Sequence, residues 1–413
     1  MQHQGPAPHA RTGAQGSLIA LCFVANMVDG FDILMIGFVG PLLLASVPMD
    51  RAALGMVISA GFVGTVLGSV LFGRAADRLG RRRTLLLALA SFGSLTLACV
   101  LVRSAWDLAL LRFAAGLGMG GAMAVIAAIV AARGGSTARH AGVTLSYLGM
   151  PCGVVVGGSL AAALMPRFGW MSVFLMSGAA ALALLLPVRL MVPADSEAAA
   201  RRAPRGEPAA PARAPAGTLL GDGRAGSALA LWTTSFVVLV LGGFLISFIP
   251  TLLAGQGMAP GRAALGAVVF NLGAIAGGVS LAAAARRREP FGPAALALVL
   301  ACALTALLGN ALGHGLAVFG WLFALGACLI GGELAIPAMA SRLFPDSVRA
   351  GGVGWTLAVG RVGSIVGPAA GGWLLQSGMA LPRLFACASL LPLAGAFAAW
   401  LAWRMLPGSP RQR

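Results

Sequence analysis

The sequence contains few charged residues and no lysine. Only 10% of its 413 residues are charged, 59% are hydrophobic, and all 29 basic residues are arginine. A soluble protein of this length needs more charge to cover its surface, so most of this chain must face lipid or other apolar segments. The composition therefore excludes an ordinary soluble protein.

The chain also lacks the residue patterns of several chemistries. The six cysteines lie in separate apolar runs without metal-ligand spacing, no histidine falls within the core of an apolar run, and no glycine-rich loop leads to a phosphate-binding lysine. The net charge of +17 comes from short clusters between apolar runs and not from one basic face. We therefore expect no metal, no cofactor, no enzymatic activity and no nucleic-acid partner.

Apolar runs recur along almost the whole chain, and each has about the 20 residues that a helix needs to cross a bilayer. They predict an all-α membrane protein with twelve transmembrane helices in two pseudo-symmetric six-helix halves. The polar, Pro- and Arg-rich stretch 193–226 is predicted to be a cytoplasmic linker, so the halves are residues 1–192 and 227–413. The expected spans are 17–46, 52–73, 84–102, 106–132, 139–164, 170–192, 227–253, 263–285, 291–312, 315–341, 348–377 and 382–405.

The arginines are distributed unequally between the two sides of these spans. With the N-terminus inside, 22 arginines fall in cytoplasmic tails and loops and five in periplasmic loops. Because positively charged segments stay on the cytoplasmic side, both termini are predicted to be cytoplasmic. The excess of Ala, Gly and Arg indicates a bacterial protein, and hence a multi-pass protein of the inner membrane.

The two halves repeat a pattern of glycines. A nearly constant offset across four pairs of helices indicates an internal duplication, which is typical of transporters that bind substrate between repeats. A shift of 210 places Gly153, Gly157, Gly116 and Gly121 on Gly363, Gly367, Gly326 and Gly331, and a shift of 209 places Gly64, Gly68 and Pro41 on Gly273, Gly277 and Pro250.

The sharpest motif is Gly73-Arg74-Ala75-Ala76-Asp77-Arg78-Leu79-Gly80-Arg81-Arg82-Arg83, between the second and third spans. It resembles the signature loop of the major facilitator superfamily, Gly-x-x-x-Asp-Arg-x-Gly-Arg-Arg. The resemblance implies a conformational latch that comprises Gly73, Asp77, Arg78, Gly80 and Arg81. In this latch, Asp77 docks at the N-terminal end of the eleventh span, where the helix dipole favours an anion. The alternative is a topology anchor at the anionic inner leaflet.

Two acids, Asp29 and Asp32, interrupt the first span. An ionisable side chain in an apolar run is costly unless it faces a cavity or a partner, and the i, i+3 spacing puts both acids on one helix face. The string Asp29-Gly30-Phe31-Asp32 resembles the first helix of the aromatic acid:proton symporter family. We therefore predict that both acids carry protons, with Glu333 in the tenth span as a third candidate. The alternative is a pair of structural acids held by a neighbouring arginine.

Arg112 in the fourth span and Arg361 in the eleventh span are the intramembrane arginines. A guanidinium can bind a carboxylate through two hydrogen bonds, so both are predicted to bind an anionic substrate. Arg112 opens a string that resembles the superfamily's fourth-helix motif, and it also lies within reach of the first-span acids. Alternatively, Arg112 extends to the periplasmic interface and Arg361 pairs with Glu333.

Two aromatic residues, Phe31 and Trp355, are predicted to line an apolar pocket for an aromatic ring. The resemblance as a whole implies a monomer that takes up a small aromatic carboxylate of the hydroxybenzoate or benzoate class, driven by the proton gradient. Its partners would be the organic anion, protons and the lipid bilayer. The alternative is a major facilitator for another organic acid, or a drug/proton antiporter.

Overall fold

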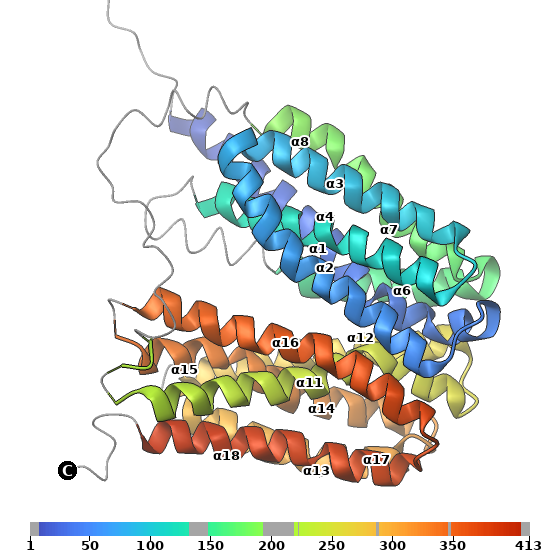
Figure 1. Cartoon of the computed structure of the whole chain (residues 1–413), viewed down its shortest axis with the longest axis vertical. Helices are drawn as coiled ribbons and strands as arrows, with labels where there is room; N and C mark the ends of the chain where they lie inside the picture. The colour runs from blue at the N-terminus through green and yellow to red at the C-terminus, as the bar shows by residue number, and fades with distance from the viewer. Residues whose placement is uncertain are drawn as a thin grey trace, which may run out of the picture. The chain divides into compact units, whose positions relative to one another are not determined.

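The computed structural model describes residues 8–131, 148–192, 219–221, 223–285, 289–345 and 348–405. Every regular element within these ranges is a helix, so the predicted all-helical fold is confirmed for them (Figure 1). Most of the predicted linker, 193–218 and residue 222, lies outside the described residues, as does 139–147 at the start of the predicted fifth span. The helices are α1 (Pro8–Ser46), α2 (Arg51–Leu79), α3 (Arg81–Ala98), η1 (Cys99–Leu101), α4 (Ala105–Ala131), α6 (Gly149–Phe168), α7 (Met171–Ala183), α8 (Leu185–Met191), α11 (Ala225–Gly255), α12 (Pro260–Ala285), α13 (Phe291–Ala311), α14 (Ala317–Leu334), α15 (Ile336–Leu343), α16 (Arg349–Gln376), α17 (Leu381–Ala388) and α18 (Leu390–Arg404).

Eleven helical segments in the described ranges are long and apolar enough to cross a membrane. They match the predicted spans apart from the eleventh. That span corresponds to α16, whose 28 residues are enough to cross a bilayer. Its glycines and Arg361 make it less apolar than the other segments.

Three spans are each divided into two α-helices, which the sequence pattern did not predict. The sixth span divides into α7 and α8, the tenth into α14 and α15, and the twelfth into α17 and α18. Pro187, Pro337 and Pro392 each follow one of these breaks by a few residues. Proline has no N–H for the carbonyl four residues earlier, so the hydrogen-bond ladder is interrupted at each break.

The signature string is mostly helical. Helix α2 continues through Asp77 to Leu79, beyond the predicted end of the second span at residue 73, and α3 begins at Arg81. Gly80 is the single residue between them, and its φ of 91° lies in the region that only glycine adopts at little cost. The turn between α2 and α3 therefore depends on Gly80.

The chain divides into two compact units, Met1–Ile36 with Ala60–Arg205, and Gly37–Ser59 with Gly206–Arg413. The first unit has an apolar core that includes Cys22 of α1, Phe92 of α3 and Met119 of α4. In the second unit, α11 packs against both α16 and α18 (Figure 1). The end of α1 and the start of α2 belong to this second unit.

Glycines let two pairs of helices in the first unit approach until their backbones touch. Along α6, a methyl group at Gly149 or Gly153 would overlap the carbonyl groups of Phe23 or Met27 on α1, and one at Gly157 would overlap the ring of Phe31. Along α2, Gly64 and Gly68 meet the carbonyl groups of Phe113 and Leu117 on α4 in the same way. We call these contacts the α1–α6 and α2–α4 seams.

The second unit contains both seams again at the predicted offsets. Gly363 and Gly367 of α16 meet the carbonyl groups of Phe236 and Val240 on α11. These residues lie 209 or 210 positions after Gly153, Gly157, Met27 and Phe31. Gly273 and Gly277 of α12 likewise meet the carbonyl groups of Phe323 and Ala327 on α14. The internal duplication is therefore confirmed by matching backbone approaches.

We predict that Gly153→Val strongly reduces the yield of folded protein. Its side chain would displace the backbone of α1, and overpacking of this kind costs about 1–3 kcal/mol or more. Gly320→Val, in α14, is the matched control because a Cβ at Gly320 meets no atom within 4 Å. Size-exclusion profiles and thermal unfolding in detergent compare the two variants. Equal profiles and unfolding temperatures of the two variants would show that α1 and α6 can move apart without loss of stability.

Candidate functional site

Helix α1 directs its acids away from the α1–α6 seam. Phe23, Met27 and Gly30 face α6, whereas Asp29 and Asp32 lie on another side of the helix. Asp32 is 0% exposed and Asp29 is 5% exposed. The predicted acids are therefore buried inside the first unit.

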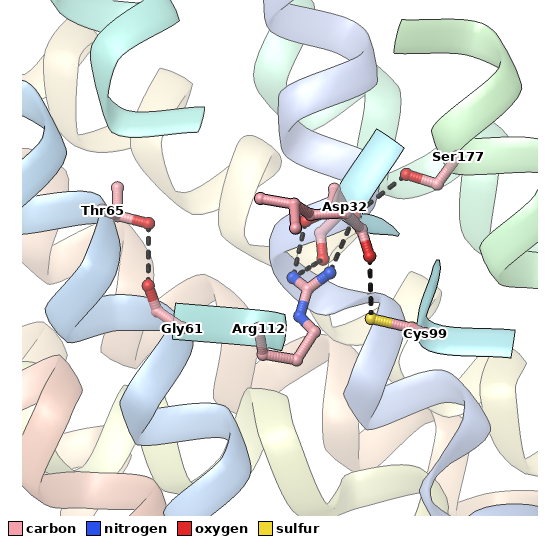
Figure 2. Close-up of polar contacts among 7 residues, drawn as sticks. Asp32, Gly61, Thr65, Cys99, Arg112 and Ser177 are labelled. Atoms are coloured by element: carbon pink, nitrogen blue, oxygen red, sulfur yellow. Dashed lines mark hydrogen bonds and ion pairs between the residues drawn. The ribbon is translucent and has the colours of Figure 1, made fainter. Parts of the chain in front are cut away.

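The first unit brings Arg112 of α4 onto Asp32. Arg112 Nη2 lies 2.6 Å from Asp32 Oδ2, and Nη1 donates to Oδ1 over 3.2 Å (Figure 2). This is a two-pronged ion pair, the geometry that favours arginine over lysine. Arg112 is 4% exposed, so the alternative in which its side chain extends to the interface is wrong.

A third group, Ser177 of α7, completes the site. Its hydroxyl donates to Asp32 Oδ1 over 2.9 Å, and Ser177 is 0% exposed (Figure 2). Cys99 of η1 lies beside the pair, and its thiol hydrogen-bonds the carbonyl group of Leu95 over 3.4 Å. The sequence pattern did not reveal either residue, because a lone serine or cysteine in an apolar run carries no distinctive signal.

Arg361 of α16 is exposed. On the same helix face one turn later, the carbonyl group of Ile365 accepts a hydrogen bond of 2.6 Å from Ser59, which belongs to the same unit. Within the described part of the chain, Arg361 forms no ion pair, so its predicted alternative pairing with Glu333 is not formed. Glu333 is partly buried in the last turn of α14, beside the break that precedes Pro337.

The predicted aromatic residues have structural contacts. The ring of Phe31 packs on Gly157 in the α1–α6 seam. Trp355 of α16 stacks on Trp232 of α11 with ring centroids 6.1 Å apart, and it remains 39% exposed. Their role in binding a substrate ring stays a prediction.

The signature residues lie at the junction of α2 and α3. Asp77 and Arg78 are exposed, and Arg81 Nη1 donates to the carbonyl group of Ala128 on α4 over 2.8 Å. Arg81 therefore ties the junction to the end of α4. Asp77 belongs to the first unit and α16 to the second. The docking of Asp77 onto α16 stays a prediction.

A family model described as "Major Facilitator Superfamily" matches residues 22–332, which is most of the chain. The chain belongs to the major facilitator superfamily. Its two units, repeated seams and intramembrane charges are thus those of a membrane transport protein.

Similar curated proteins are bacterial transporters whose names refer to aromatic acids. The chain is 35% identical to a gallate transporter of Pseudomonas putida, with 93% of this chain and 91% of the relative covered. It is 32% identical to a 4-hydroxybenzoate transporter of Pseudomonas aeruginosa, with 94% and 92% covered. It is 31% identical to a 3-(3-hydroxy-phenyl)propionate transporter of Escherichia coli, with 87% of each covered.

Solved structures share the fold of this major facilitator protein at low sequence identity. A D-xylose-proton symporter superposes with a TM-score of 0.76 at 14% identity, covering 95% of this chain and 98% of that one. A bacterial homolog of the human lysosomal transporter Spinster superposes with a TM-score of 0.75 at 19% identity, covering 97% and 98%.

The contribution of the ion pair to stability can be tested by replacing its members with the apolar residues found at the equivalent places in the second unit. At the offsets of the seams, Asp32 corresponds to Leu241 and Arg112 to Leu322, which are both fully buried. We expect Asp32→Leu or Arg112→Leu alone to destabilise the protein by about 3–5 kcal/mol, because each leaves a buried charge without its partner. The double variant should recover most of that loss.

Unfolding by SDS in mixed micelles measures these free energies. Arg342→Gln is the control, since it breaks an exposed ion pair. The side chains of Arg342 and Glu289 are 61% and 47% exposed, so this substitution should lower the free energy of unfolding by no more than about 1 kcal/mol. Additive losses in the double variant would mean that Asp32 and Arg112 are not coupled.

Proposed function

We propose that this protein is a proton-coupled transporter that takes up a small aromatic carboxylate by alternating access. The relatives named for gallate, 4-hydroxybenzoate and hydroxyphenylpropionate support this substrate class. The arginine distribution supports a bacterial inner-membrane protein with both termini in the cytoplasm. Each protein molecule would act alone as a monomer.

The observation that carries the proposal is the buried Asp32–Arg112 ion pair. In this arrangement both prongs of the guanidinium are occupied by the carboxylate, at 2.6 and 3.2 Å. A substrate carboxylate can bind Arg112 in the same two-pronged way only when Asp32 releases it. Protonation of Asp32 removes the negative charge that holds the guanidinium, so it would make Arg112 available to the substrate.

Such an exchange couples the substrate to protons without further machinery. On the acidic periplasmic side, Asp32 takes a proton and Arg112 takes the substrate anion. On the cytoplasmic side, the proton leaves and the restored carboxylate competes with the substrate for Arg112. Asp29, one turn from Asp32 on the same helix, places a second acid in this region and would tune the exchange.

Arg361 is the proposed second contact for the substrate carboxylate. An exposed guanidinium at mid-membrane depth is too costly to face lipid, so it is expected to face an aqueous or substrate-filled path. Its side of α16 agrees with this placement, since the main-chain carbonyl group of Ile365, one turn later, accepts a hydrogen bond from Ser59. Trp373, on another face of α16, is 66% exposed, as expected for a residue in contact with lipid.

Uptake of labelled gallate, 4-hydroxybenzoate, benzoate and a non-aromatic acid tests the proposal in cells and in proteoliposomes. We expect the aromatic acids to accumulate under an inward pH gradient and a protonophore to abolish that accumulation. Accumulation that ignores the protonophore would refute proton symport. Preference for the non-aromatic acid, or proton-driven export of a drug, would instead support the alternative major facilitator functions.

In the same assay, Asp32→Asn should abolish accumulation driven by the pH gradient, and Asp29→Asn should reduce it less. Asparagine keeps the shape of the side chain but cannot exchange a proton. Exchange of labelled for unlabelled substrate needs no net proton movement and should survive in at least one variant. Both variants must reach the membrane in normal amounts. Full accumulation in both would assign the proton to another residue, and Glu333 would be the next candidate.

Arg361→Lys should keep the charge but weaken binding of the aromatic carboxylate. An ammonium group cannot present the planar fork, and the expected loss is about 2–3 kcal/mol, or roughly 30- to 150-fold in affinity. Equilibrium binding to purified protein measures the loss, and Arg383→Lys, whose exposed side chain lies at the start of α17, serves as the control. Equal affinity of Arg361→Lys and the parent would remove Arg361 from the site.

A further inference from the structure

Arg112 and Ser177 are the partners of Asp32 among the described residues, and of these two only Ser177 can both donate and accept a hydrogen bond. We propose that Ser177 is a positioning residue that keeps Asp32 hydrogen-bonded to α7, whether Asp32 is ionised or protonated. When the ion pair opens, Arg112 then moves and Asp32 stays in place. The proposal rests on the function proposed above and assigns a part in proton coupling to α7.

One carboxylate oxygen of Asp32 is shared between Ser177 and Arg112. Asp32 Oδ1 accepts from Ser177 over 2.9 Å and from Arg112 Nη1 over 3.2 Å, whereas Oδ2 accepts from Arg112 Nη2 over 2.6 Å. Arginine has only donors, so a protonated Asp32 offers it one acceptor fewer. A serine hydroxyl can reverse its role and accept from the new O–H group. Asp32 therefore keeps its bond to α7 when its bond to α4 weakens.

The position of Ser177 is fixed by close packing of α7 on α3. A methyl group at the next residue, Gly178, would lie 2.7 Å from Leu97 and 2.8 Å from the carbonyl group of Gly93. A methyl group at Gly93 would lie 3.0 Å from the carbonyl group of Gly178. With Ser177 0% exposed, water has no access to replace its hydroxyl. Ser177 can thus act as a fixed point for Asp32.

Three charged or titratable groups of the described residues lie near Asp32. Arg112 from α4 pairs with it, Cys99 from η1 lies beside the pair, and Asp29 lies one turn away on α1 itself. Helix α6 faces α1 through glycines and main-chain carbonyl groups at this level. If a substitution of Ser177 changes the pH dependence of uptake, substituting each of these neighbouring groups can show which of them contributes to the change.

Ser177→Ala removes a donor that favours the carboxylate form. The pH at which uptake falls to half should then rise by about one unit, a tenfold change in proton concentration. Release of the proton in the cytoplasm should become slower, so maximal uptake falls while the KM for substrate changes little. Ser177→Cys has a weaker donor of similar size, so its pH of half-maximal uptake should lie between those of the parent and Ser177→Ala.

The test compares uptake from pH 5 to 8 and substrate exchange at each pH for parent, Ser177→Ala, Ser177→Cys and Ser172→Ala. Ser172, on the same helix, donates only to the carbonyl group of Gly169 and should leave the profile unchanged. Ser177→Ala in an Asp32→Asn background should produce no further change in the pH profile of exchange. If Ser177→Ala fails to fold, Ser177→Cys carries the test with a smaller shift in the same direction.

A parent that shows no dependence on the pH gradient would refute the proposed function. A parent that shows this dependence, with an unchanged profile in folded Ser177→Ala and Ser177→Cys, would overturn only the role of Ser177. A shift of equal size in Ser172→Ala would also overturn it, because the effect would then come from α7 in general.

Discussion

The candidate site of the first unit depends on one interaction, the buried ion pair between Asp32 and Arg112. Removing a carboxylate and a guanidinium from water is costly, and their attraction offsets that cost only when the geometry is good and the remaining polar atoms are bonded. Here the two-pronged contact and the Ser177 hydroxyl provide both conditions. Loss of any one member leaves a charge or a polar group buried without its partner.

The seams make this burial possible. Close backbone approach along α1–α6 and α2–α4 leaves no space for water at those faces, and it fixes the rotation of α1 and α4 about their axes. With α1 held to α6 through Phe23 and Met27, Asp32 must point elsewhere, where α4 and α7 supply its partners. Small residues where helices meet thus determine where charged side chains pair, as expected in a bilayer without a hydrophobic driving force between helices.

The sequence predicts the fold well and the site in part, for physical reasons. Apolar length and glycine spacing are local or periodic signals, so the spans and the duplication could be read directly. The i, i+3 acids and the intramembrane Arg112 stood out because charge is rare in lipid. Ser177 could not be found in this way, since its role depends on which face of α7 meets α1. The helix breaks were missed because a proline inside a span does not always interrupt it.

The comparison between the two units agrees with the proposed role of the ion pair in transport. Both units keep the glycine seams at an offset of 209 or 210 residues, yet the second places Leu241 and Leu322 where the first has Asp32 and Arg112. Those leucines are fully buried, so the same helix packing forms around apolar side chains without any charge. Replacing a buried ion pair with apolar residues is often neutral or stabilising, so stability alone gives no reason to keep one. The first unit retains a costly pair, which agrees with the proposed proton exchange at Asp32, while the second carries Arg361 on a glycine-rich helix. The duplication thus supplies two equivalent scaffolds that differ in their charged side chains.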